Sequence, residues 1–342
     1  MIKKALFGKN LSEITEIVSA NGLPAFAAKQ ITDWLYKKEI SDIEEMSNIS
    51  AANRKKLADN YCVGIEKPVQ VSVSSDGTKK YVFQVGNKHF IESVFIPDKE
   101  RNTLCISSQI GCKMNCLFCA TGKQGFSGNL TANQILNQMR SIEEFNSLTN
   151  IVFMGMGEPL DNITEVLKAI DILTSSYGYG WSPKRITVST VGVLAPLKQF
   201  LEKSQCNLAI SVHAGNSFVR KELVPLEKTQ PMQEIMALVK NYDFTHQRRL
   251  SIEYILFDQL NDTEEQALLL ASMLKQIPCR INLIPYHRIP QVGLMPSSRE
   301  KIENFQKILM KKGITTTIRR SRGQDIEAAC GMLSTKFVNT SN

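Results

Sequence analysis

Hydrophobic and β-branched residues gather in short continuous runs between residues 103 and 319, and helix-like segments separate these runs. Continuous runs of this kind are typical of strands that are covered on both faces of a parallel sheet. Helix starts are visible between them, because Thr131-x-x-Gln134 and Thr263-x-x-Gln266 have the spacing of capping boxes. The predicted strands are 103–107, 150–155, 185–190, 207–213, 249–256, 280–286 and 315–319.

The order strand, helix, strand repeats along this region, with strand starts 22 to 47 residues apart. This spacing is typical of βα units around a parallel sheet. A complete eightfold barrel takes about 250 residues, whereas this region offers six or seven strands. The sequence therefore predicts an α/β fold with an incomplete parallel barrel of the (βα)6 type. Its chemistry is expected at the carboxyl ends of the strands.

Two smaller segments precede the predicted barrel. Residues 1–65 have the short amphipathic patterns of helices, for example over 27–36. Residues 66–97 alternate with period two around the hairpin signal Asp76-Gly77, which predicts a short β element with a further strand at 91–96. We expect four parts: a small N-terminal helical accessory domain (1–65), a β extension (66–97), the barrel (98–333) and a flexible tail (334–342).

The composition is that of a globular protein, with 43% hydrophobic and 22% charged residues, which excludes a wholly disordered chain. The 41 basic and 33 acidic residues give a net charge of +8, which favours a polyanionic partner. The chain starts without the apolar run of a signal peptide, and its longest apolar stretch, 267–274, is too short to cross a bilayer. We expect a soluble cytoplasmic protein, not bound to a membrane, whose eight cysteines are reduced.

Three cysteines form the strongest chemical signal. Cys112, Cys116 and Cys119 have C-x3-C-x2-C spacing in the loop after the first barrel strand. Closed zinc sites and most iron–sulfur clusters use four ligands, so three thiolates predict a metal centre with an open coordination position. A zinc site closed by a distant Cys or His is the alternative. The cysteines that match no functional pattern are interpreted as structural: Cys62, Cys206 and Cys279.

The cysteine loop resembles that of the radical S-adenosylmethionine (SAM) enzymes, in which three cysteines bind a 4Fe–4S cluster whose open iron chelates SAM. Further motifs resemble the RlmN/Cfr group of RNA methyltransferases, over about residues 20–333, and are closer to RlmN than to Cfr. These motifs are Cys105-Ile-Ser-Ser-Gln-Ile-Gly-Cys112, Met154-Gly-Met-Gly-Glu-Pro-Leu160, Ser211-Val-His213, Ile281-Asn-Leu-Ile-Pro285 and Arg322-Gly-Gln-Asp-Ile-Glu-Ala-Ala-Cys-Gly331. The resemblance implies a radical SAM barrel with one cluster and two SAM molecules per turnover.

The resemblance also implies a radical route to carbon 2 of adenine, which has no lone pair with which to attack the methyl group of SAM. Cys330 accepts a methyl group from a first SAM, and cleavage of a second SAM makes a radical that removes a hydrogen from it. The resulting methylene radical adds to adenine. Glu92 is implied as the base for the ring proton. Cys105 is implied as the thiol that attacks the Cys330 sulfur and leaves a transient disulfide.

Contacts to SAM are implied at the ends of four strands. Gly157 and Glu158 follow the second strand and suit the amino group of SAM, because glycine allows close approach and a carboxylate attracts an ammonium. His287 stands where the family usually has Asn, and its neutral imidazole can still donate or accept one hydrogen bond. The remaining implied contacts end the third and fourth strands: Ser189, Ser211, Val212 and His213. The basic run 319–322 would lower the pKa of the Cys330 thiol if the fold brought the two together.

The partners implied by the resemblance are an adenosine in large-subunit (23S) ribosomal RNA and, in a subset of tRNAs, the adenosine 3′ of the anticodon. A reducing electron donor such as flavodoxin and a monomeric protein are also implied. Basic clusters at 37–38 and 54–56 are solvated faces or nucleic-acid contacts. Three alternatives stay open: a Cfr-like methylation of carbon 8, another radical SAM reaction, and a zinc-stabilised RNA-binding protein without catalysis.

Overall fold

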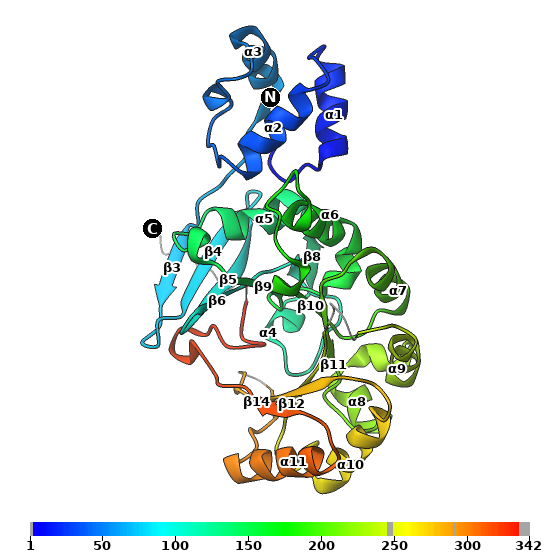
Figure 1. The fold of residues 1–342 in the computed structure, drawn as a ribbon. Coiled ribbons are helices and arrows are strands. Elements are labelled where there is room, and N and C mark those ends of the chain that lie inside the picture. The colour runs from blue at the N-terminus through cyan, green and yellow to red at the C-terminus, as the bar shows by residue number, and fades with distance from the viewer. Residues whose placement is uncertain (1–2, 245–248, 290–291, 335–342) are drawn as a thin grey trace.

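The computed structural model describes residues 3–244, 249–289 and 292–334. Its centre is a curved ten-stranded sheet with the order β14-β13-β12-β11-β10-β9-β6-β5-β4-β3 (Figure 1). The seven strands from β6 to β14 in this order are parallel neighbours, which confirms the strands predicted for the barrel. They are β6 (Arg101–Cys105), β9 (Asn150–Phe153), β10 (Ile186–Thr190), β11 (Asn207–Ser211), β12 (Leu250–Leu256), β13 (Arg280–Pro285) and β14 (Thr316–Ile318).

Helices cover the outer face of the parallel strands (Figure 1). The sheet does not close on itself, because β14 and β3 are its two edges, so the barrel is incomplete as predicted. The covering helices are α5 (Ala132–Arg140), α6 (Ile163–Thr174), α7 (Leu194–Lys203), α8 (Ser217–Leu223), α9 (Met232–Lys240), α10 (Glu264–Met273) and α11 (Arg299–Lys311). Short 3-10 turns join many elements: η1 (Ile43–Glu45), η2 (Phe145–Ser147), η3 (Pro159–Asn162), η4 (Pro183–Arg185), η5 (Pro225–Lys228) and η6 (Gln324–Ile326).

The two predicted capping boxes differ in the structure. At the start of α5 the box is complete, because Thr131 accepts from the Gln134 N–H and the Gln134 side chain accepts from the Thr131 N–H. At the start of α10, Thr263 caps the Gln266 N–H, but the Gln266 side chain does not return to the cap. Its Oε1 instead accepts from Gly215 N at 2.7 Å and ties α10 to the loop after β11.

The β element before the barrel belongs to the same sheet. Strands β3 (Gln70–Val73), β4 (Lys79–Val85) and β5 (His89–Asp98) are antiparallel, and β5 continues antiparallel into β6. The sheet therefore runs without a break through residue 97, where a boundary between parts was expected. Two further pairs of strands are too short to show an alternating pattern in the sequence. They are β1 (Lys4–Ala5) with β2 (Tyr61–Cys62), and β7 (Gln109–Gly111) with β8 (Phe126–Asn129).

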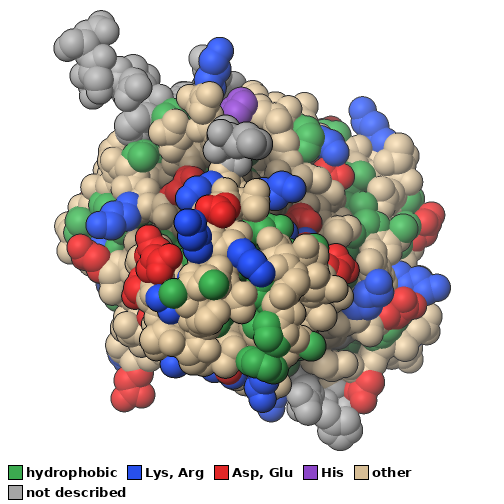
Figure 2. Space-filling model, turned by 90° about the horizontal axis from the view of Figure 1, so that it is seen from above, with side chains coloured by type: hydrophobic (Ala, Val, Ile, Leu, Met, Phe, Trp, Pro, Cys, Tyr) green, Lys and Arg blue, Asp and Glu red, His purple; other side chains and the backbone are tan. Residues whose placement is uncertain are grey.

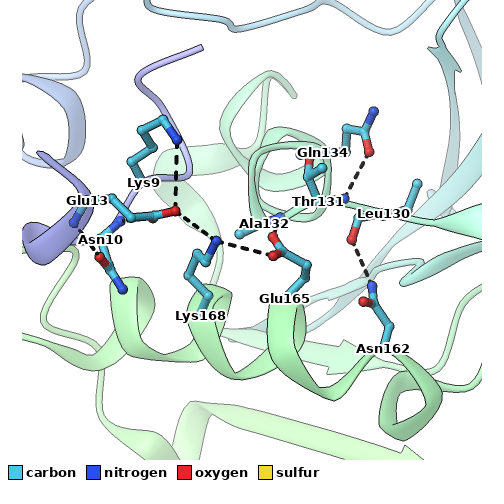
Figure 3. A network of polar contacts seen from close by, with 10 residues as sticks. All are labelled: Lys9, Asn10, Glu13, Leu130, Thr131, Ala132, Gln134, Asn162, Glu165 and Lys168. Carbon is cyan, nitrogen blue, oxygen red and sulfur yellow. Dashed lines mark hydrogen bonds and ion pairs between the residues drawn. The ribbon is translucent and has the colours of Figure 1, made fainter. Parts of the chain in front are cut away.

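The N-terminal segment forms α1 (Leu11–Ala20), α2 (Ala27–Tyr36) and α3 (Ala51–Asn60) beside α5 and α6 (Figure 1). Figure 3 shows the polar part of this contact, in which Lys168 of α6 bonds Glu13 of α1 at 3.0 Å and Glu165 at 3.2 Å. The buried side chains of the segment and of the barrel form one continuous apolar cluster. From residue 335 the predicted tail lies outside the described residues. Within the described ranges, no helix combines the length and apolar composition needed to cross a membrane.

Candidate active site

A cavity of about 1060 Å³ fills the interior of the incomplete barrel. Parallel strands end at the same edge of a sheet, so residues that are far apart in the chain meet there. Most of the site residues predicted from the sequence line this cavity: Cys105, Cys112, Cys116, Cys119, Gly157, Glu158, Ser189, Ser211, His213, His287 and Cys330. Glu92 and Val212 do not contribute to its wall.

The loop with the three cysteines is held by its backbone. Gly111 has φ +74°, and a Cβ there would lie 1.8 Å from the Gly125 carbonyl, so only glycine permits this approach of β7 and β8. Cys112 N donates to the same carbonyl at 2.9 Å, and Leu117 N donates to Leu223 O of α8 at 2.9 Å. The helix α4 (Ala120–Lys123) then begins directly after Cys119. These contacts give the thiols a defined position.

The three thiols fit an iron–sulfur cluster by their chemistry. Burial raises the pKa of Cys112 to about 12. The pKa of Cys116 is also raised, mainly by burial and to a smaller extent by the neighbouring thiols of Cys119 and Cys112. Thiols in such surroundings ionise when a metal supplies the positive charge. Among the described residues no three Cys, His, Asp or Glu side chains surround one position for a single ion. A cluster does not need that arrangement, because each thiolate binds a different iron.

Two further thiols, Cys105 and Cys330, face the same cavity. Cys105 ends β6 between Val94 of β5 and Val152 of β9, and its side chain is buried. Burial, and then the charge of the nearby Cys330, raises the pKa of Cys105 to about 12. Cys330 is exposed to the cavity, but the protein around the cavity still desolvates its thiol and raises its pKa, and the guanidinium of Arg319 acts in the opposite direction. The basic run thus acts on Cys330 as expected, but desolvation outweighs it.

Hydrogen bonds from two sides hold the loop that carries Cys330. Ala120 N of α4 donates to Gly331 O at 2.8 Å, and Thr121 Oγ1 donates to Leu333 O at 2.8 Å. On the other side, Asp325 accepts from Ser74 Oγ at 2.6 Å, in the turn between β3 and β4. Figure 1 shows this segment, coloured red, leaving β14 and returning toward α4. The loop therefore presents Cys330 beside the cysteine loop.

Glu158 lies at the carboxyl end of β9 and is buried against two backbone donors. Its Oε1 accepts from Leu160 N at 3.0 Å, and its Oε2 accepts from Val191 N at 3.0 Å. Burial, which these hydrogen bonds only partly offset, raises its pKa to about 7. The preceding Gly157 has φ +99°, and a Cβ there would lie 2.5 Å from the Gln109 side chain. Glycine is therefore required at this turn.

The two histidines border the cavity in different settings. His213 Nδ1 accepts from Ile255 N at 3.1 Å, so the neutral ring carries its proton on Nε2. Burial, and then the charge of Arg220, lowers the pKa of His213 to about 3. His287 Nε2 lies 2.7 Å from Ser321 Oγ, which connects the end of β13 to the C-terminal segment, and burial lowers its pKa. Both rings are therefore neutral hydrogen-bonding groups near pH 7.

Val212 lies behind the cavity, with its side chain in the core. Its N donates to Glu253 O at 3.0 Å, and its carbonyl accepts from Arg220 Nε at 3.0 Å. Because both backbone groups have protein partners, the structure offers no free polar group of Val212 to a ligand.

Glu92 lies on the same face of β5 as Val94 and Ile96, which line the cavity, but its carboxylate is covered. Oε1 pairs with Lys80 Nζ at 3.2 Å, and Oε2 accepts from Ser334 N at 2.8 Å. Burial raises the pKa of Glu92, and Lys80 and the Ser334 N–H reduce this rise without reversing it. Glu92 is therefore a partly shielded carboxylate that holds a proton more tightly than an exposed one.

Sequence reasoning missed several residues of the site. Glu253 is buried on β12, where Asn282 Nδ2 donates to its Oε1 at 2.8 Å and Arg319 lies 3.9 Å from its Oε2. Glu253 could have been noticed in the sequence, because it is the single acidic residue within the apolar run 249–256. Gln109, which accepts from Glu158 N at 2.9 Å, lies inside the motif that runs from Cys105 to Cys112. No local sequence motif points to a role for Arg220.

Known proteins match this chain over nearly its whole length. A family model described as the radical SAM superfamily matches residues 106–271, and one described as the ribosomal RNA large subunit methyltransferase N-terminal domain matches residues 4–63. A relative from Parabacteroides distasonis, named "probable dual-specificity RNA methyltransferase RlmN", is 56% identical over 97% of both chains. The chain belongs to the RlmN family. The dual-specificity RNA methyltransferase RlmN of Desulfotalea psychrophila is 40% identical, over 96% of this chain and 94% of the relative.

The fold agrees with this membership. The crystal structure of a radical SAM methyltransferase from Sphaerobacter thermophilus superposes with a TM-score of 0.91 at 36% identity, over 97% of this chain and all of that one. The chain therefore has the radical SAM fold and is a radical SAM methyltransferase. Membership in the RlmN family brings a 4Fe–4S cluster and SAM as its cofactors.

Proposed function

We propose that this protein methylates carbon 2 of an adenosine in RNA, through a methylated Cys330 and a transient disulfide between Cys330 and Cys105. The observation that carries the proposal is that these two thiols face one cavity together with the three-cysteine loop. In a methyltransferase that used polar transfer alone, neither thiol would have a task.

Cys112, Cys116 and Cys119 would hold the cluster, and Glu158 and the strand-end residues around it would orient SAM. When bound, the cluster supplies the electron that cleaves the sulfonium of SAM. Gly157, Ser189, Ser211, His213 and His287 offer backbone and side-chain polar groups around the same space. Val212 would act through the shape of the β11 end, since its own polar groups already have partners.

Cys330 first acts as a nucleophile: its thiolate forms an S–CH3 bond as the S–CH3 bond of SAM breaks, and the thioether product of SAM leaves. The radical fragment of a second SAM would take a hydrogen atom from this methyl group, and the carbon radical left on Cys330 would add to adenine. The adduct would then return one electron to the oxidised cluster and give up the ring proton, which Glu92 would accept. Attack of the Cys105 thiolate on the Cys330 sulfur would break the carbon–sulfur bond to the RNA, and the released carbon would take up a proton to become the methyl group. The Cys105–Cys330 disulfide that remains is reduced by an external thiol.

The proposed substrates are large-subunit ribosomal RNA and a subset of tRNAs. The description of the N-terminal family model supports large-subunit ribosomal RNA, and the dual-specificity names of the relatives support a second RNA target, which the motif resemblance implies to be tRNA. The net charge of +8 is compatible with a polyphosphate partner. An adenine in folded RNA must be unstacked to enter the cavity, as in other enzymes that modify bases. We further propose that the protein acts as a cytoplasmic monomer, receives electrons from a donor such as flavodoxin, and uses its N-terminal domain (1–65) to bind RNA.

The test is anaerobic purification followed by mass spectrometry of digested RNA after incubation with SAM and a reductant. We expect a brown protein with iron and sulfide that makes 2-methyladenosine, whereas Cys112→Ala makes none. 8-Methyladenosine as the product would replace the carbon-2 assignment with a Cfr-like one. A colourless protein with stoichiometric zinc and no product would refute the proposal altogether.

A further inference from the structure

Arg220 is a buried arginine behind the cavity, with 1% of its side chain exposed. Its guanidinium bonds the ends of two strands: Nε donates to Val212 O at 3.0 Å, and Nη2 donates to Val191 O at 2.8 Å and to Ser211 O at 3.2 Å. Val191 follows β10, and Ser211 ends β11. One side chain thus ties together two strand ends that carry proposed SAM contacts.

The charge of Arg220 is matched by one equally buried carboxylate. Arg220 Nη1 pairs with Glu227 Oε2 at 2.6 Å, and both side chains are 1% exposed. The same oxygen accepts from Met232 N at 3.0 Å, while Glu227 Oε1 is buried without a hydrogen-bond partner in the described chain. The pair carries one positive and one negative charge at defined positions within a low-dielectric region, where charges act over longer distances than at the surface.

The helix that carries Arg220 also holds the cysteine loop. Leu223 of α8 accepts from Leu117 N at 2.9 Å, and Leu223 and Val224 pack in one apolar cluster with Cys116 and Phe118. The charge of Arg220 favours the thiolate form of Cys116 and acts against a charge on His213. Arg220 bonds the carbonyls of Val191 and Ser211, two residues that line the cavity, whereas Glu227 accepts from Met232 N at the start of α9. The guanidinium is therefore on the cavity side of the pair.

We propose that Arg220 is a positioning residue that couples the cluster to the SAM site: its hydrogen bonds align the ends of β10 and β11, and its charge stabilises the reduced cluster. This inference rests on the proposed binding of a cluster by Cys112, Cys116 and Cys119. Reduction adds an electron to the cluster, so a fixed cation close to one thiolate makes reduction easier and a fixed anion makes it harder. The buried pair thus adjusts the potential at which SAM is cleaved.

The experiment compares the cluster potentials of charge variants with that of the wild-type holoenzyme. Proteins are reconstituted anaerobically with iron and sulfide and titrated with dithionite, and the reduced cluster is followed by electron paramagnetic resonance. Arg220→Gln leaves the Glu227 charge unpaired, and we expect a shift to more negative potential. Glu227→Gln leaves the Arg220 charge unpaired, and we expect a shift to more positive potential. The double variant Arg220→Gln/Glu227→Gln should lie between Arg220→Gln and wild type.

A second measurement separates the alignment of the strands from the charge. Arg220→Lys keeps the charge but loses most of the bonds to the strand ends, because an ammonium lacks the planar fork of a guanidinium. We expect its potential to stay close to wild type while SAM binds several-fold more weakly. Arg185→Gln is the matched control. Arg185 donates to Thr149 O at 2.7 Å and to Leu148 O at 2.5 Å, but it precedes β10 at the opposite end of the strands. Neither the potential nor the SAM affinity should change in this control.

Shifts of the cluster potential in the same direction in Arg220→Gln and Glu227→Gln, or no shift in either, would overturn the inference. If the pair only supported the fold, removing either partner would disturb the cluster in the same way. A wild-type protein that binds no cluster would overturn the proposed function as well. If Arg220→Gln does not fold, a positive shift in Glu227→Gln beside an unchanged potential in Arg220→Lys still supports the inference, and an unshifted Glu227→Gln overturns it.

Discussion

The two carboxylates near the cavity, Glu92 and Glu158, are both buried, and burial raises the pKa of each. Glu158 receives two backbone N–H groups, whereas Glu92 pairs with Lys80 and accepts only the Ser334 N–H. Glu158 therefore has a fixed orientation suited to binding a cation. Glu92, with its pKa above that of an exposed carboxylate, is suited to taking up a proton.

The pKa of about 7 at Glu158 predicts a pH-dependent affinity for SAM. Above this pH the carboxylate is ionised and attracts the ammonium of SAM, and below it the group is protonated. We expect SAM to bind about tenfold more weakly at pH 6 than at pH 8, measured by equilibrium binding. In Glu158→Gln this pH dependence should be absent.

The same shift predicts the opposite trend for stability. The folded state holds the Glu158 proton more tightly than the unfolded state does, so stability from this group is present below about pH 4.5 and is lost as the pH rises toward 7. The loss at full ionisation is about 3 kcal/mol. Denaturant unfolding of wild type against Glu158→Gln measures it, and a difference that does not vary with pH would contradict the raised pKa.

Replacing Glu92 by Gln removes the proposed proton acceptor and keeps the side chain's size. Methylation of Cys330 should proceed as in wild type, because that step precedes the loss of the ring proton. Release of methylated RNA should slow by about 100-fold or more, so that covalently linked protein and RNA accumulate on denaturing gels. Glu143→Gln is the control, because Glu143 is an exposed carboxylate paired with Lys79. An unimpaired Glu92→Gln enzyme would exclude Glu92 from the reaction.

At the scale of elements, the C-terminal segment after β14 decides where Cys330 lies. Besides Asp325, two residues tie it to the antiparallel part of the sheet. Gly323 N donates to Asp76 Oδ2 at 3.1 Å, and Arg322 lies 3.4 Å from Asp98. The β extension thus acts as a platform for the segment, and α4 holds its other end. Cys330 is fixed between elements that flank the barrel on two sides.

Asp325→Ala tests this platform. The change removes the acceptors of Ser74 Oγ and of Ser75 N, so Cys330 should lose its fixed position relative to Cys105. We expect RNA methylation to slow by about 10- to 100-fold, the range that follows from misplacing a reacting group. SAM cleavage should be unchanged, because the cysteine loop and the strand ends are separate elements. Asp59→Ala, on exposed α3, is the control. Equal losses of cleavage and methylation would show that Asp325 supports the fold instead.

At the scale of the whole molecule, the N-terminal helices and the barrel share one apolar core. Gly8 approaches α5 so closely that a Cβ would lie 2.3 Å from Asn133 N. Deleting residues 1–65 would therefore uncover α5, and such a truncation alone would mix folding with RNA binding. On the face seen in Figure 2, basic and acidic side chains are interspersed, so the net charge by itself does not define an RNA surface there.

Surface substitutions in α3 give a cleaner test of RNA binding. Lys55 and Lys56 are exposed on this helix, so Lys55→Gln/Lys56→Gln removes two charges without opening the core. RNA affinity should fall, and the slope of its logarithm against the logarithm of salt concentration should become shallower by about 0.7 to 0.9 for each phosphate that is no longer neutralised. Methylation of Cys330 without RNA should not change.

The pair Lys311 and Lys312 at the end of α11 serves as the control, because it is exposed at the opposite end of the molecule (Figure 1). Lys311→Gln/Lys312→Gln should leave the RNA affinity close to wild type. Equal losses of affinity in the two double variants would show that charge acts non-specifically, and that α3 is not a dedicated RNA-binding element.

The order of strands and helices, the incomplete barrel and the three-cysteine loop were all predictable from the sequence alone. The reason is that each depends on local information. A strand covered on both faces needs a continuous apolar run, a helix start needs its cap, and cysteines a few residues apart meet without help from distant segments. The seven parallel strands confirm this reasoning. The family motifs likewise lie within short stretches of chain.

Only the tertiary structure decided which distant groups meet. Packing of the C-terminal segment against α4 and the β extension brings Cys330 toward Cys105. The surrounding protein desolvates the Cys330 thiol, and this effect on its pKa exceeds that of the basic run. Glu92 shares a face of β5 with residues of the cavity wall, but Lys80 and the Ser334 N–H cover its carboxylate. Arg220 reaches two strand ends from a helix with no local motif. Such contacts depend on how whole elements pack, which a local pattern of residues does not encode.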